Sequence, residues 1–335
     1  MKFIDFFSGV GGFTRGLELA GHECIGHCEF DKFAEASYRA MHTATAEQLK
    51  HLASLPKHKR QKEILKDEYL NGEWYEQDIR AVRAANMPVA DCWTFGAPCQ
   101  DFSIAGRRAG LEGGRSSLVR EVFKILEETK EEDKPTWLIY ENVKGMLSAG
   151  RGLDFLSILA EMDRLGYDAE WQIINSRWYV PQNRERIYVV GCYRGRSRRQ
   201  IFPIKGAGGE NRLEFVGGVY SEKDGRLRNS YRTYHSRGLA PCINTSGGGN
   251  REPHICFEVD MSRGAKSSDI ATLWSDKYNS YLAIRKLTPR ECFRLQGWTD
   301  GYFKRAEFTN SNSQLYKQAG NGVTVNVVKA IGEKI

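Results

Sequence analysis

Two patterns of apolar and polar positions alternate over residues 1–194. Short apolar runs of the kind that form buried strands are separated by longer segments in which apolar residues recur at helical spacing. The predicted strands span residues 3–7, 24–29, 92–95, 138–141, 169–175 and 186–192, and the predicted helices span residues 12–20, 32–41, 117–129 and 153–165. Strands that alternate with helices are typical of a mostly parallel sheet covered on both faces. The pattern therefore predicts a doubly wound α/β domain.

The pattern changes twice along the chain. Residues 42–74 are polar and rich in Lys and Glu, with a helical composition, and we interpret them as a surface insertion. From about Gly195 glycine and arginine become frequent and helical spacing disappears, which predicts a smaller, loop-rich, mostly β domain. We expect a first domain of residues 1–194, completed by residues 310–335, and a second domain of residues 195–309.

Helix-start signals return near the end of the chain. Thr288 and Pro289 form an N-cap followed by proline at the first helical position, which predicts a helix over residues 287–298. A last helix is predicted over residues 323–331.

Length and composition are those of a globular protein. The 335 residues, of which 41% are hydrophobic and 27% charged, are enough for two domains. No apolar stretch is long enough to span a bilayer and no signal-peptide pattern follows Met1, so we expect a cytoplasmic protein with no membrane partner. The eight cysteines form no CxxC pair and no Cys/His cluster of zinc spacing, so we expect reduced thiols and no metal.

The net charge of +7 is concentrated in one stretch. Residues 195–251 contain eleven Lys or Arg against four Asp or Glu, which equals the whole excess of the chain. Such a stretch fits contact with a polyanion, and it fits a solvated basic loop equally well.

A glycine-rich turn follows the first predicted strand. Ser8, Gly9, Gly11 and Gly12 lie where a ligand can approach the backbone at a helix N-terminus, although their spacing is not that of a dinucleotide-binding GxGxxG motif. Glu29 ends the second strand, a position suited to hydrogen bonds with ribose hydroxyls. Turn and acid together favour a nucleoside-bearing ligand over a purely structural role.

Further chemistry-bearing side chains end the next strands. Cys99 follows an apolar run within Pro98-Cys99-Gln100, and a cysteine in such a place is more often a core residue than a nucleophile. Glu141 ends a later strand, and the carboxyl ends of parallel strands share one edge, so both could face one crevice with the glycine turn. Arg184 and Arg186 enter another strand, where one could reach a ligand while the other holds structure.

Together these motifs resemble those of the DNA cytosine-5 methyltransferase family. The matching blocks keep the family's order and spread over nearly the whole chain. They are residues 7–13, 29–31, 78–79, 98–100, 102–103, 115–118, 141–143, 182–186, 285–298 and 318–323. Ala97 and Gly322 depart mildly from the family pattern, and neither position carries a reacting group. The resemblance implies a Rossmann-like first domain that uses S-adenosyl-L-methionine, and a second domain that recognises the target.

The same resemblance implies a covalent methyl transfer to C5 of cytosine. Cys99 would add to C6 of the ring. Glu141 would contact the exocyclic amine and N3, and Arg186 would face O2, where negative charge accumulates. Arg184 joins this catalytic set with an orienting role. The cytosine must leave the duplex to reach these groups, so we expect base flipping.

The remaining site residues are also implied by the resemblance. The cofactor-binding residues are Phe7, Ser8, Gly9, Gly11, Gly12, Glu29, Phe30, Asp78, Ile79, Pro98, Leu118, Asn321 and Val323. We expect Gln100, Ser103, Arg115, Arg228, Arg232 and Arg237 to bind DNA. The arginines of the basic stretch suit phosphate contacts and Tyr231, Tyr234 and His235 suit stacking on bases, although each of these residues fits an ordinary surface role at least equally well. We expect double-stranded DNA as partner and S-adenosyl-L-homocysteine as product. We further expect a nucleoid-associated monomer in a bacterial or phage-infected cell, linked to a restriction endonuclease or solitary.

Other interpretations stay open at this point. A tRNA cytosine-5 methyltransferase of the same family would share the catalytic blocks, although the large basic lobe favours DNA. A catalytically silent nucleic-acid-binding relative would not be expected to keep every reacting group. The glycine spacing disfavours a nicotinamide dehydrogenase, and no Pro-Pro-aromatic tetrapeptide indicates methylation of amino groups.

Overall fold

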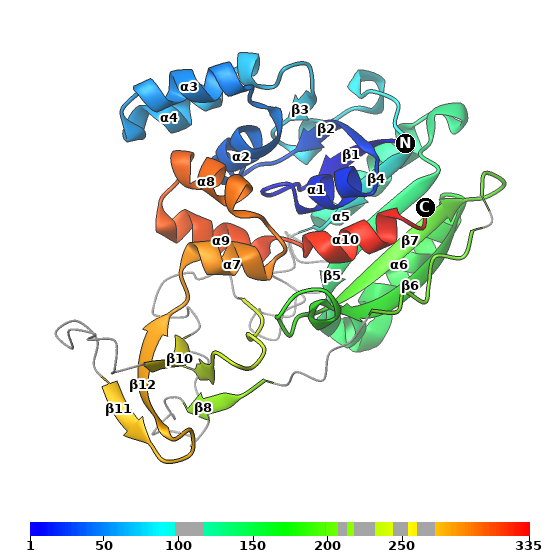
Figure 1. Cartoon of the computed structure of the whole chain (residues 1–335). Helices are drawn as coiled ribbons and strands as arrows, with labels where there is room; N and C mark the ends of the chain where they lie inside the picture. The colour runs from blue at the N-terminus through cyan, green and yellow to red at the C-terminus, as the bar shows by residue number, and fades with distance from the viewer. Residues whose placement is uncertain (98–116, 198, 207–212, 218–231, 244–253, 260–271) are drawn as a thin grey trace.

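In the computed structural model, helices join two β-sheets of different size (Figure 1). The structure describes residues 1–97, 117–197, 199–206, 213–217, 232–243, 254–259 and 272–335. Within these residues the large sheet has seven strands and the small sheet has five. The helices are α1 (Gly12–Leu19), α2 (Lys32–Tyr38), α3 (Ala46–Ser54), α4 (Lys57–Ile64), α5 (Ser117–Glu128), α6 (Leu153–Arg164), α7 (Pro289–Leu295), α8 (Asp300–Thr309), α9 (Asn312–Asn321) and α10 (Val325–Gly332).

The large sheet has the strand order β3-β2-β1-β4-β5-β7-β6. Its strands are β1 (Lys2–Phe6), β2 (Glu23–Cys28), β3 (Trp74–Glu76), β4 (Cys92–Phe95), β5 (Trp137–Val143), β6 (Tyr167–Asn175) and β7 (Glu185–Tyr193). The pairs among β1 to β5 are parallel, whereas β7 is antiparallel to both β5 and β6. The chain leaves β1 toward β2 and returns to β4 on the other side, so the strand order reverses between β1 and β4. In open α/β sheets, ligands bind at such a switch point beyond the carboxyl ends of the strands.

Both faces of the large sheet are buried, and its side chains alternate between two cores. In β5, Leu138 and Tyr140 pack in the core that contains α5 and α6. Ile139, between them, packs in the core that contains α1 and α10, which lie together on one side of the sheet in Figure 1. A strand covered on both faces has no solvent-facing side, which explains why this one is almost entirely apolar.

Two further hydrophobic clusters hold the remaining helices. The helices α7, α8 and α9 pack around Val10 and Met41 of the first predicted domain. The helices α2, α3 and α4 pack around Leu52 and Ile64, which fastens the predicted insertion to the rest of the molecule. α7 and α8 belong to the second predicted domain, whereas Val10 and Met41 belong to the first, so the first of these clusters contains residues of both. The domain boundary after residue 309 stays a prediction.

The small sheet has the order β11-β12-β10-β9-β8. Its strands are β8 (Phe215–Gly217), β9 (Thr233–His235), β10 (His254–Val259), β11 (Thr272–Ser275) and β12 (Ser280–Lys286). β12 is antiparallel to β10 and β11, and β9 is parallel to β10. Figure 1 shows this sheet apart from the large one, on the side away from both termini.

Most predicted elements of residues 1–194 are confirmed with small shifts at their ends. The second helix is shorter than predicted, because a π-helical turn over Arg39–Thr43 follows α2. Thr288 caps α7 as predicted, with its side chain accepting from the backbone of Glu291, but the helix ends at Leu295. The sequence pattern missed β3, α8 and α9.

Candidate active site

The turn after β1 has a backbone conformation that few residues adopt. Phe7, Gly9 and Gly11 have positive φ angles of 57°, 58° and 81°, a region that favours glycine. A Cβ on Gly11 would lie 2.4 Å from His42 Nε2, so glycine is required there. A Cβ on Gly9 would meet no atom within 4 Å. The backbone at Gly9 therefore faces open space, as a ligand-binding turn requires.

The last predicted cofactor block, residues 318–323, packs against the same turn. A Cβ on Gly12 would lie 2.6 Å from Val323 Cγ2, so the loop after α9 packs directly against the turn. Val323 is buried, whereas Asn321 is exposed at the end of α9. Ser8 Oγ is buried without a hydrogen-bond partner among the described residues. The fold thus brings together predicted cofactor residues from opposite ends of the chain.

Glu29 ties the glycine turn to the end of β2. Its Oε2 accepts a hydrogen bond from the Gly9 amide at 2.7 Å, and its Oε1 accepts one from the Asp31 amide at 2.7 Å. Burial raises the pKa of Glu29 to about 7 despite these hydrogen bonds. The neighbouring Phe30 side chain is 65% exposed. A carboxylate, an exposed ring and an open glycine suit a nucleoside, which offers hydroxyls and a flat base.

The other predicted cofactor residues lie after β3 and on α5. Asp78 accepts hydrogen bonds from Arg80 Nη2 at 2.6 Å and from Arg80 Nε at 2.9 Å, and these bonds lower the pKa of Asp78. Ile79 is buried in the core that contains α5, and Leu118 packs half-buried against the same core. Pro98 lies outside the described residues.

Glu141 lies beside the backbone that leads to Cys99. β4 and β5 are paired in parallel with Phe95 opposite Tyr140, and Gly96 and Glu141 come next on the two strands. A Cβ on Gly96 would lie 3.5 Å from Glu141 Oε2. Cys99 itself follows three residues after Gly96 and lies outside the described residues. The described part of the site therefore places the predicted acid beside Gly96, three residues before the predicted nucleophile.

Glu141 and Arg186 form a buried ion pair. Arg186 Nε lies 3.1 Å from Glu141 Oε1. Burial raises the pKa of Glu141, and the charges of Arg186 and Arg184 counteract part of that rise. A carboxyl group with a raised pKa and a fixed cationic partner can exchange a proton with a ligand while it keeps its orientation.

Arg184 has a different environment from Arg186. It is 3% exposed, and its Nη2 donates to the carbonyl oxygens of Gly322 at 2.8 Å and Gly320 at 3.3 Å. Its Nη1 donates to the carbonyl oxygens of Gly320 at 3.3 Å and Ile243 at 3.4 Å. Burial and the neighbouring Arg186 lower its pKa. These contacts suit a residue that holds loops in place rather than one that touches a ligand.

The predicted DNA-binding residues are only partly described. Those outside the described residues are Gln100, Ser103, Arg115 and Arg228. Arg232 directly precedes β9. Arg237 is exposed, and its Nη2 donates to Glu258 Oε2 on β10 at 2.6 Å.

The expectation that Tyr234 and His235 stack on bases is wrong. These side chains are 8% and 2% exposed. The His235 ring stacks on Tyr278, with ring centroids 4.2 Å apart. As consecutive strand residues they point to opposite faces of β9, and both faces are buried, so the two side chains stabilise the small sheet. Tyr231 lies outside the described residues.

Cys242 lies at the site although the sequence motifs did not indicate it. Its Sγ accepts hydrogen bonds from Arg184 Nη1 at 3.5 Å and from Arg186 Nη2 at 3.9 Å. A weak signal was present, because Pro241-Cys242 repeats the dipeptide Pro98-Cys99. Nothing in the sequence pattern indicates that this part of the second domain returns to the arginines.

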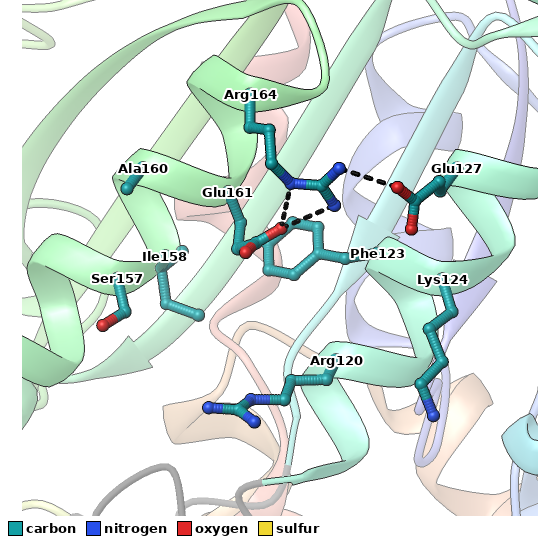
Figure 2. A pocket seen from close by; sticks show the side chains of 9 residues that line it. All are labelled: Arg120, Phe123, Lys124, Glu127, Ser157, Ile158, Ala160, Glu161 and Arg164. Atoms are coloured by element: carbon teal, nitrogen blue, oxygen red, sulfur yellow. Dashed lines mark hydrogen bonds and ion pairs between the residues drawn. The ribbon is translucent and has the colours of Figure 1, made fainter.

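A separate open pocket of about 430 Å³ lies between α5 and α6 (Figure 2). Phe123 and Ile158 contribute apolar lining, and Arg164 pairs with Glu127 at 2.7 Å and with Glu161 at 2.9 Å. None of the residues predicted from the sequence to act in catalysis or binding lines this pocket. We therefore do not assign it to the active site.

Two other kinds of site were sought in the part of the chain that the structure describes. None of its helices is both long and apolar enough to cross a membrane. No three His, Cys, Asp or Glu side chains in these ranges are grouped to hold a metal ion.

The doubly wound sheet and the glycine turn at its switch point define the class of α/β proteins that bind a nucleoside-bearing ligand. The chain belongs to the family of C-5 cytosine-specific DNA methylases, whose model matches residues 1–335. The predicted family and enzyme class are thereby confirmed. The family implies S-adenosylmethionine as methyl donor and DNA as substrate.

Named relatives and solved structures agree with this assignment. The chain is 29% identical over 369 residues to the type II methyltransferase M.HhaI of Haemophilus parahaemolyticus, covering 100% of this chain and 94% of the relative. It is 27% identical over 458 residues to the orphan methyltransferase M.SPBetaI of Bacillus phage SPbeta, covering 100% and 97%. The S. pombe Dnmt2 methyltransferase structure matches with a TM-score of 0.63 at 16% identity, covering 98% of this chain and 96% of that one. The Entamoeba histolytica methyltransferase EhMeth matches with a TM-score of 0.64 at 15% identity, with the same coverage. These structural likenesses confirm the predicted Rossmann-like fold.

Proposed function

We propose that the protein transfers a methyl group from S-adenosylmethionine to C5 of a flipped-out cytosine in a specific double-stranded DNA sequence. The observation that carries this proposal is the buried pair of Glu141 and Arg186, 3.1 Å apart at the strand end that leads to Cys99. The pair offers a carboxyl group that can exchange a proton and a positive charge, next to Gly96, which precedes the proposed nucleophile by three residues. Nucleophilic addition to a pyrimidine ring needs this combination.

The residues around the glycine turn fit the methyl donor. The open space at Gly9, the Glu29 carboxylate and the exposed ring of Phe30 match the chemistry of a nucleoside. When bound, S-adenosylmethionine supplies an electrophilic methyl group on a sulfonium centre. The residues proposed to hold it are Phe7, Ser8, Gly9, Gly11, Gly12, Glu29, Phe30, Asp78, Ile79, Pro98, Leu118, Asn321 and Val323.

Cys99 is the proposed nucleophile. Its thiolate forms a bond to C6 of cytosine, and the electron pair of the 5,6 double bond moves to C5, which becomes nucleophilic. After C5 is methylated, loss of the C5 proton restores the double bond and expels the Cys99 thiolate from C6. A cationic neighbour such as Arg186 would favour the thiolate form.

Glu141 and Arg186 would orient the base and stabilise the charge that develops on it. Attack at C6 sends negative charge through the ring toward N3 and O2. A protonated Glu141 donates to N3, which agrees with the raised pKa of this carboxyl group. Arg186 donates to O2 as a preorganised cation, and Arg184 acts as a positioning residue for the loop at Gly320–Gly322.

The substrate is proposed to be duplex DNA. A stacked cytosine cannot offer C5 and C6 to groups on both sides of its ring, so the target base must leave the helix. We propose residues 195–309 as the target-recognition domain, because their basic stretch suits phosphate contacts. The relatives include both type II and orphan methyltransferases, so a cognate restriction endonuclease is a partner to be tested.

Transfer of tritiated methyl groups to unmethylated duplex DNA and to tRNA tests the proposal. The wild type should label duplex DNA, and bisulfite sequencing should find 5-methylcytosine within one short sequence. Labelling of tRNA alone would indicate a tRNA methyltransferase, and no labelling of either would overturn the proposal. Cys99→Ala should abolish labelling, whereas Cys192→Ala near the far end of β7 should not.

A further inference from the structure

A short segment of the second predicted domain docks against the catalytic arginines. The Asn183 amide donates to the Ala240 carbonyl oxygen at 2.8 Å, and the Ala240 amide donates to the Pro181 carbonyl oxygen at 2.8 Å. The Gln182 side chain accepts from the Ile243 amide at 3.4 Å. Residues 240–243 therefore run beside the residues that lead into β7, and they carry Cys242 with them.

Cys242 completes the set of contacts that fixes Arg186. Each guanidinium nitrogen of Arg186 has a partner: Nε lies near Glu141, Nη1 donates to the Glu185 carbonyl oxygen at 2.8 Å, and Nη2 donates to Cys242 Sγ at 3.9 Å. The first two partners lie on β5 and β7, next to Arg186 in the sheet. Among these partners, only the sulfur comes from the docked segment 240–243.

The charges around Cys242 favour a sulfur that accepts hydrogen bonds. Burial would raise the pKa of this thiol, but Arg184 and Arg186 outweigh burial and hold the pKa below its ordinary value. Among the described residues, Glu141 adds a negative charge next to Arg186, with its Oε1 3.1 Å from Arg186 Nε. Cys192, on the same strand as Arg186, has a pKa raised by burial. The arginines therefore distinguish Cys242 from a cysteine of similar exposure.

We propose that Cys242 is a positioning residue that holds the guanidinium group of Arg186 against Glu141. The orientation of Arg186 in the active site then depends on the docking of residues 240–243. The inference deepens the proposed function and rests on it. If the docked segment 240–243 moved away from β7, Arg186 Nη2 would lose its contact with the sulfur of Cys242. The arginine would then be less well oriented toward the base.

An isosteric pair of variants tests the coupling. Val and Thr have the same branched shape, which is slightly larger than that of Cys, so Cys242→Val removes the acceptor whereas Cys242→Thr places a hydroxyl acceptor in the same space. Under single-turnover conditions Cys242→Val should slow methyl transfer about 10-fold, while Cys242→Thr should stay within about 3-fold of the wild type. The dissociation constant for duplex DNA should be unchanged in both, and thermal unfolding confirms that each variant is folded. Cys192→Val is the matched control and should keep the wild-type rate.

Several results would overturn the proposal. Equal rates for the Val and Thr variants would show that the acceptor does not matter. A loss confined to DNA affinity, with the single-turnover rate intact, would indicate a direct DNA contact instead.

A second measurement does not depend on activity. Alkylation by iodoacetamide at a series of pH values, read by peptide mass spectrometry, gives the ionisation midpoint of each cysteine in the wild-type chain. The midpoint of Cys242 should lie clearly below that of Cys192, because the arginines lower the pKa of the first thiol and burial raises that of the second. A midpoint as high as that of Cys192 would overturn the inference even if the enzyme proved active. An inactive wild type with a low midpoint at Cys242 would instead overturn the proposed function and leave the arginine contact established.

Discussion

The part of the site proposed to bind the cofactor, here called the cofactor half, and the part proposed to bind the target base, here called the base half, are constructed in different ways. The cofactor half comes mainly from residues 5–31, where the glycine turn and Glu29 hydrogen-bond each other within one β-α-β unit. The base half contains Gly96, Glu141, Arg186 and Cys242, which come from four separate segments. Each contact among them joins residues that are far apart in the sequence.

This difference has consequences for how the halves respond to change. In the cofactor half the coupling stays within one β-α-β unit, where the Gly9 amide and Glu29 are in direct hydrogen-bond contact, so effects at these two residues should not be additive. The base half is a chain of contacts from Gly96 through Glu141 and Arg186 to Cys242, so each member sets the position of the next. Such networks give non-additive effects.

The largest effect should come from Glu141→Gln in the base half. The amide keeps the shape but cannot donate a carboxyl proton to N3, so the single-turnover rate of methyl transfer should fall about 10²- to 10³-fold with little change in DNA affinity. Arg186→Lys should also slow the reaction, and the double variant should lose less than the product of the single losses. Multiplicative losses would show that Glu141 and Arg186 act independently of each other.

The next largest effect concerns stability and Arg184. Arg184→Met would leave the carbonyl oxygens of Gly320 and Gly322 without their buried donor, so urea unfolding should show a loss of about 3 kcal/mol. Arg164→Met removes an exposed arginine that pairs with Glu127 and Glu161, and should cost less than about 1 kcal/mol. Equal losses would mean that Arg184 does not hold the loop after α9.

Variants of two glycines in the cofactor half distinguish an effect on packing from an effect on ligand binding. Gly11→Ala would place a methyl group 2.4 Å from His42 Nε2 at a positive φ, and should lower the free energy of unfolding by about 2 kcal/mol or more. Gly9→Ala meets open space and should cost about 1 kcal/mol or less. It should nevertheless weaken the binding of S-adenosylhomocysteine in calorimetry. If Gly9→Ala binds normally, the open space at this turn does not hold the cofactor.

The pH dependence of binding tests Glu29. Its folded pKa of about 7 lies above the ordinary value of 4.5, so ionisation of Glu29 reduces fold stability as pH rises from 4.5 to 7, and no further loss follows above that range. Ribose hydroxyls bind the carboxylate, so the affinity for S-adenosylhomocysteine should rise about 10-fold between pH 6 and pH 8. Glu29→Gln should bind weakly at every pH, without this slope. A wild-type slope that survives in Glu29→Gln would assign the titration to another group.

The smallest effect should come from Arg237 in the second domain. Its exposed pair with Glu258 suggests that Arg237→Ala changes stability by less than about 1 kcal/mol. If Arg237 contacts a phosphate, the slope of log affinity for duplex DNA against log salt should fall by about 1, with no change in sequence preference. An unchanged slope would remove Arg237 from the DNA-binding residues.

The contacts within the cofactor half could be predicted from the sequence better than those within the base half, for a physical reason. The glycine turn and Glu29 lie in adjacent predicted elements, so local spacing alone indicated their association. Val323 could be linked to Gly12 only through the family resemblance. Cys242 escaped prediction because its proximity to Arg186 depends on how residues 240–243 dock on the large sheet, which no local pattern encodes. Likewise, Tyr234 and His235 looked available for stacking because the small sheet that buries them had no clear periodicity.

The reversed direction of β7 determines which residues can take part in the chemistry. In an all-parallel sheet, the crevice is lined only by residues that follow a strand, as Gly9 and Cys99 do. Because β7 runs antiparallel to β5, it begins where its neighbour ends, and Val143 pairs with Arg186. The site thereby gains a residue from the start of a strand, whose backbone is already held in the hydrogen-bonded sheet. The arginine side chain thus starts from backbone that is paired with β5, and contacts at its guanidinium group fix its far end.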